Sequence, residues 1–149
     1  MTRKFQLNLE LWPLIVLVAD DDPSDEDIDA MFRQYEAVFA RKERFAALTD
    51  ARRVRKIPDA ILRARIGAWA HAMEPMLSFS VGHATVLTNP LARGVMTAIS
   101  WFYKVKAPQA YFGTMLEACD WCIGHLRASG VPVTPALETY RALLTQGSV

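Results

Sequence analysis

In the first part of the chain, apolar and polar residues alternate, and a continuous apolar run follows. From Phe5 to Leu11 every second side chain is apolar and the ones between are polar, which is the period of a half-buried strand. Trp12-Pro13 interrupts this pattern. Residues 14–19 then read LIVLVA, a run typical of a central strand that is covered on both faces. Together the two segments predict a β-hairpin.

A helix is predicted directly after this hairpin. Residues 22–26 read DPSDE, which provides a capping side chain, a proline for the first turn and acids near the positive end of the helix dipole. Apolar residues then recur at helical spacing, at Ile28, Met31, Phe32, Tyr35, Val38 and Phe39. The helix should therefore run to about Arg41.

The rest of the chain continues to alternate between strand and helix patterns. Strands are predicted over residues 45–49, 77–87 (with a bend at Gly82) and 109–112. Helices are predicted to run from Pro58 to Pro75, from Asn89-Pro90, from the capping box of Thr114 and Glu117, and from Thr134-Pro135.

This order predicts an α/β fold. We expect a mixed, mostly parallel β-sheet of four or five strands with an N-terminal hairpin, covered by helices. We assign residues 1–130 to this domain and residues 131–149 to a C-terminal helical extension, because Gly130 is a stop signal.

Composition narrows the class of protein. A chain of 149 residues, 52% hydrophobic and 22% charged, can bury a core of its own. The net charge of +1 provides no global field toward nucleic acid or an anionic membrane. The apolar run at residues 14–18 is too short for a membrane span, so no membrane insertion is expected. The chain has two cysteines, three positions apart, which predicts a reducing, cytoplasmic location.

Several segments carry a resemblance to a known family. They are FAALTDAR at residues 45–52, GHATVLTNPLARGVMTAISWF at residues 82–102 and EACDWCIGHL at residues 117–126. With the landmarks Asp50, Asn89-Pro90, Arg93-Gly94 and Trp121, residues 5–129 resemble the STAS/SEC14 group, that is, the SpoIIAA-like (anti-sigma-factor antagonist-like) proteins of bacteria. The resemblance implies a SpoIIAA-like fold and a non-catalytic regulatory or protein-interaction module. Its SEC14 side implies the alternative, a carrier of a small apolar ligand.

The sequence departs from that family at the regulatory position. In the regulatory members a serine or threonine near the start of the helix after the Asp50-type strand is phosphorylated. Between Ala51 and Met76 this chain has no serine or threonine at all. The phosphorylation switch is therefore not expected here.

Two loops of opposite charge should meet at one edge of the sheet. The basic loop after Asp50 contains Arg52, Arg53, Arg55 and Lys56, whereas residues 20–29 contain seven acids. Parallel strands place both loops at the carboxyl edge, where open α/β sheets bind ligands. Either the two loops neutralise each other, or the arginines form an anion-binding or partner-binding site. No aromatic residues are interleaved with the arginines, so nucleic-acid binding is not expected.

Two further arginines are candidates for the same site. Arg65 falls within the apolar arc of its helix, which includes Ile61, Leu62 and Trp69. It must extend to the rim or meet an acid or carbonyl under the helix, with Asp50 as one such partner. Arg93, one turn into its helix, could also reach an anion, or it could simply lie on the surface.

Cys119, Cys122 and His125 have a spacing that invites metal or redox chemistry. On one helix, residues at i, i+3 and i+6 do not converge on an ion, and redox CxxC pairs normally begin a helix. We therefore predict core-facing cysteines, with no metal and no cofactor. The sequence contains no catalytic constellation, and His71 and His83 are isolated. The expectation is that the protein is not an enzyme.

Three adjacent rings at Trp101, Phe102 and Tyr103 cannot all face one core. They form either a small local core or an interface for a partner. With almost no net charge to keep copies apart, we expect a homodimer that uses these rings or the C-terminal extension. The predicted function is a non-catalytic protein-interaction or regulatory module, and the alternative is a carrier of a small apolar or anionic ligand.

Overall fold

The computed structural model describes residues 4–90 and 107–147, and in them the chain forms one five-stranded sheet. The strands lie side by side in chain order: β1 (Phe5–Asn8), β2 (Leu14–Ala19), β3 (Phe45–Asp50), β4 (Ser80–Val86) and β5 (Gln109–Phe112). β1 and β2 are antiparallel, and every other pair is parallel. The predicted hairpin and the mixed, mostly parallel sheet are confirmed.

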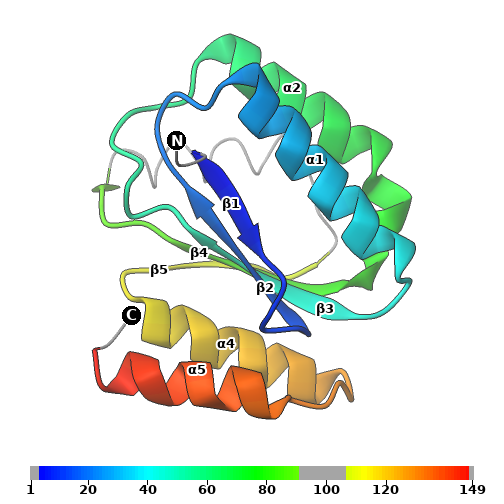
Figure 1. The fold of residues 1–149 in the computed structure, drawn as a ribbon, viewed down its shortest axis with the longest axis vertical. Helices are drawn as coiled ribbons and strands as arrows, with labels where there is room; N and C mark the ends of the chain where they lie inside the picture. Colours follow the sequence, from blue (N-terminus) through cyan, green and yellow to red (C-terminus); the bar gives the residue numbers. More distant parts are fainter. Residues whose placement is uncertain (1–3, 91–106, 148–149) are drawn as a thin grey trace.

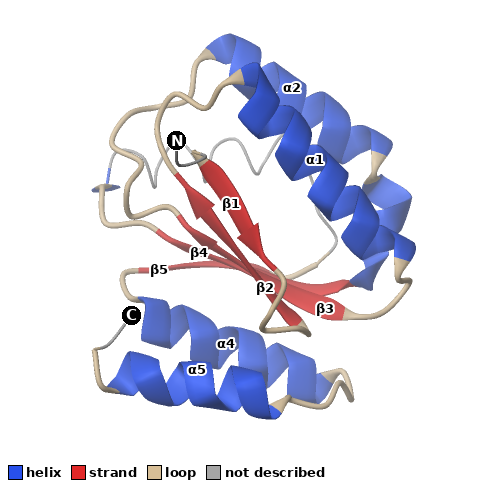
Figure 2. Ribbon diagram, viewed as in Figure 1, coloured by secondary structure: helices blue, strands red, loops and turns tan. Residues whose placement is uncertain are grey.

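Helices cover both faces of this sheet (Figure 1). They are α1 (Asp25–Ala40), α2 (Ala60–Ala72), the 3₁₀ helix η1 (Glu74–Phe79), α4 (Met115–Ala128) and α5 (Pro135–Thr145). α1 and α2 lie on one face, and α4 and α5 lie on the other (Figure 2). The protein is thus an α/β structure with a helix layer on each side of the sheet.

The two faces of the central strands enter two different cores. Leu14, Val16 and Leu48 pack with α4 and α5, whereas Ile15 and Phe45 pack with α1 and α2. Successive side chains of a strand point to opposite faces, and here both faces are apolar. This explains why β2 is a continuous apolar run in the sequence.

Two predicted helix starts are wrong by one or two residues. α1 is capped by Ser24, which forms a capping box with Asp27, so Pro23 lies before the cap and not in the first turn. α2 is capped by Asp59, one residue after Pro58. Both segments contain more than one residue that can begin a helix, and the side chain that reaches the free N–H groups decides which one does.

The strand expected over residues 77–87 is shorter than predicted. Residues 74–79 form η1, with Pro75 near its start, and β4 begins only at Ser80. The predicted bend is present as a register shift opposite Phe45 and Ala46, beside Gly82. A Cβ atom at Gly82 would lie 3.0 Å from the Trp121 ring. This close approach of α4 explains the glycine.

The last elements agree with the sequence. Thr114 caps α4 and Thr134 caps α5, each by accepting a hydrogen bond from a first-turn N–H group. The Thr134 hydroxyl also donates to the Trp12 carbonyl, at 3.0 Å. Leu137 and Leu144 are buried in the same core as β2. The boundary at residue 130 stays a prediction, and the helix predicted from Asn89-Pro90 falls largely outside the described residues.

In the described part of the chain, no helix combines the length and the apolar character that crossing a bilayer requires.

Candidate functional site

The two charged loops do meet at the carboxyl edge of the sheet, as predicted. β2 and β3 are parallel neighbours, and both end at this edge with an aspartate, Asp20 directly after β2 and Asp50 at the end of β3. An open depression of about 460 Å³ lies there, lined by Asp20, Asp50, Arg52, Arg53 and Arg55. All five lining residues carry a charge.

Asp50 is held by one arginine. The Arg52 guanidinium donates from Nε and Nη2 to the two carboxylate oxygens, each at 2.9 Å, and the Arg52 backbone N–H donates as well. Burial by itself raises the pKa of Asp50, but these hydrogen bonds outweigh it and hold the pKa below its usual range. Arg52 is therefore committed to an internal carboxylate.

The acidic loop binds the basic loop both through backbone N–H groups and through an ion pair. The Asp21 carboxylate accepts hydrogen bonds from the N–H groups of Arg55 and Lys56, at 3.1 to 3.3 Å. The Lys56 ammonium lies 2.6 Å from Asp22, and that contact raises the pKa of Lys56. The expected pairing of side chains between the two loops is thus present at Lys56, whereas Arg52 pairs with Asp50 at the end of its own strand.

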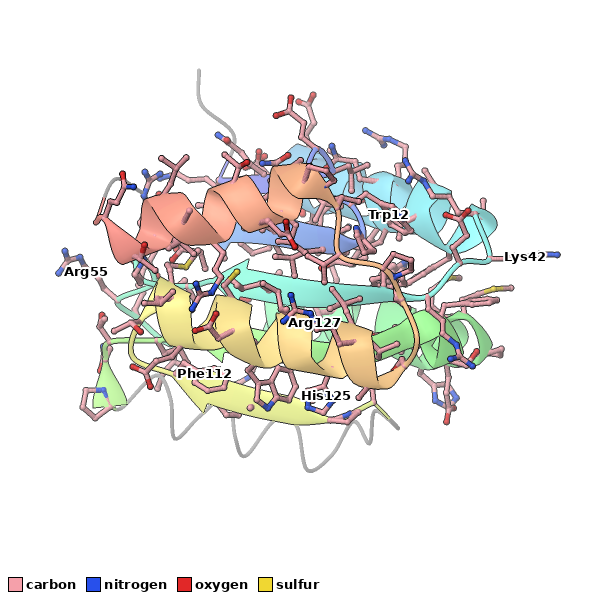
Figure 3. The ribbon with its side chains drawn as sticks, turned by 90° about the horizontal axis from the view of Figure 1, so that it is seen from below. Trp12, Lys42, Arg55, Phe112, His125 and Arg127 are labelled. Atoms are coloured by element: carbon pink, nitrogen blue, oxygen red, sulfur yellow. The ribbon has the colours of Figure 1, made fainter. Side chains whose placement is uncertain are left out.

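Arg53 and Arg55 form no ion pair among the described residues, although the charge of Arg53 helps to lower the pKa of Asp50. Within residues 4–90 and 107–147, neither guanidinium has a carboxylate partner. Both residues are exposed, and Figure 3 shows Arg55 extending away from the body of the protein. Asp20, the other acid of the depression, is already 3.8 Å from Lys4. Two positive charges therefore face solvent at the carboxyl edge.

The backbone that carries these two arginines is fixed at several points. Val54, between them, packs against the apolar clusters on both sides of the loop. Its N–H donates to the Ala51 carbonyl at 3.0 Å, and the Asn89 side chain donates to the Arg55 carbonyl at 3.2 Å. A fixed backbone lowers the entropy that a loop loses when it binds a partner.

Arg65 does not take part in this site. Its guanidinium donates to Asp25 at 2.9 Å and to Asp29 at 2.7 Å, both on α1, and lies 5.9 Å from the centre of the Phe32 ring. The suggested pairing with Asp50 is wrong. Arg65 extends to the rim of the helix pair, where α1 happens to present two acids.

The remaining predicted site residues are not described. Arg93 and the ring triplet Trp101, Phe102 and Tyr103 lie outside the described residues. The proposed roles of these four residues in anion binding and in dimerisation therefore stay predictions.

The prediction that both cysteines face the core is confirmed. Cys119 and Cys122 are both fully buried against the sheet. Burial raises the pKa of Cys119 to about 11 and that of Cys122 to about 12. His125 packs on Trp121, with ring centres 4.2 Å apart. In the described part of the chain no three histidine, cysteine or acidic side chains are grouped so that they could hold a metal ion.

We expect the two thiols to be unreactive in the folded protein. Only the thiolate attacks a disulfide reagent, and burial both suppresses the thiolate and blocks access. Labelling with a chromogenic disulfide at pH 8 should be at least about a hundredfold slower than in denaturant, where two thiols should react. Rapid labelling of a chain with an unchanged circular dichroism spectrum would contradict the buried placement.

Two features of the described residues were not predicted from the sequence. His83 on β4 is not isolated, because its Nε2 lies 2.8 Å from the Thr49 hydroxyl on β3. Ile61, assigned to the apolar arc of α2, is 76% exposed, and Ile57 just before the helix is 41% exposed. Finding the contact between His83 and Thr49 would have required the register of the strands. The exposure of Ile57 and Ile61 had a possible sign in the sequence, because both isoleucines lie beside a run of arginines.

Comparisons with known proteins give no family for this chain. No family model, no curated protein and no solved structure matches it.

Proposed function

We propose that the protein is a non-catalytic interaction module that docks a protein partner at the carboxyl edge of its sheet. The observation that carries this proposal is the pair of exposed guanidiniums, Arg53 and Arg55, on a loop whose backbone is already fixed. Arginine is among the residues enriched in protein interfaces. The resemblance to the SpoIIAA-like regulatory proteins supports the same class of function.

The carrier of a small anionic ligand is the alternative at this edge. Small-molecule sites enclose most of their ligand and are lined mainly by apolar side chains. The depression here is open and lined by charged side chains. This favours a partner that covers the edge over a ligand that is held inside it.

Photo-crosslinking tests the docking proposal. A photoreactive amino acid is placed at Ala60, which is exposed at the start of α2 beside the basic loop. The matched control is Ala128, exposed at the end of α4. That end lies at the opposite edge, since Arg44, just before β3, donates to the Ser129 carbonyl at 2.9 Å.

In extracts of the native host we expect a covalent adduct of protein mass from position 60 and none from position 128. The double substitution Arg53→Gln with Arg55→Gln should reduce the adduct by about tenfold. Arg52 is left unchanged because its loss would strand the buried Asp50 carboxylate. An adduct that is equal at both positions, or unaffected by the double substitution, would contradict docking at this edge.

A further inference from the structure

We draw no further inference here: the strongest candidate, the surface patch of Ile57 and Ile61 at the start of α2, carries none, because the charges beside it are of both signs and nothing in the described residues shows what covers it.

Discussion

Replacing Leu137 with alanine should lower the free energy of unfolding by about 3 kcal/mol. Leu137 on α5 is fully buried, in a core that it shares with Leu14 of β2 and Leu126 of α4. The substitution removes buried apolar surface and leaves a cavity between the helix and the sheet. Chemical denaturation followed by circular dichroism measures the change.

The control for this experiment is Leu143→Ala. Leu143 lies on the same helix but is 37% exposed, so its loss should cost less than about 1 kcal/mol. If both substitutions had equally small effects, α5 would be a dispensable extension. A large difference between them, with a single unfolding transition, would make α5 part of the domain and move the boundary expected at residue 130.

Acidification from pH 7 to pH 5 should destabilise the protein by about 1 to 2 kcal/mol through His83 alone. Burial lowers the pKa of His83 to about 4 in the folded state, against 6.5 for the unperturbed group. Between these values the unfolded chain binds a proton that the folded chain excludes, so stability is lost as the pH falls below about 6.5. The partial exposure of His83 places the effect below the full value of the shift.

His83→Gln is the substitution that tests this slope. Glutamine does not titrate and can still hydrogen-bond to Thr49, so the dependence of stability on pH between 7 and 5 should become flatter by the same amount. His71→Gln, at an exposed position of α2, should leave the slope unchanged. A wild-type protein that is equally stable at pH 7 and pH 5 would contradict the assignment of a neutral, half-buried imidazole to His83.

Local patterns in the sequence were enough to predict the strands and the charged edge. The run LIVLVA records that both faces of β2 are covered, and the aspartates after β2 and β3 mark where these strands end. The rule that parallel strands share a carboxyl edge then brought the two loops together. None of these steps requires knowledge of a distant contact.

The predictions that were wrong concern residues whose positions depend on packing between distant segments. A helical wheel places Arg65 and Ile61 on the inner side of α2, but the helix leans on α1 through Trp69 and Leu62. In this arrangement Ile61 is exposed, and Arg65 reaches Asp25 and Asp29, which are 40 and 36 positions away in the chain. The pairing of His83 with Thr49 follows in the same way from the register of β3 and β4.

The order of the strands has a consequence for synthesis on the ribosome. Because β1 to β5 lie in the sheet in the order in which they occur in the chain, each new strand can join the edge left by the one before it. α1 and α2 arrive during this growth, but α4 and α5 follow β5. Until then, α4 and α5 do not yet cover the face of the sheet with Leu14 and Leu48. An apolar sheet face in a nascent chain is prone to aggregation.

In the last step of folding, α5 packs against the N-terminal part of the chain. When α5 docks, Thr134 donates to the Trp12 carbonyl and Leu137 reaches the core beneath β2. The N-terminal hairpin therefore completes its packing only after α5 has been synthesised. We expect ribosome-bound chains that end before residue 135 to be captured by holding chaperones, and release from them to coincide with the emergence of α5.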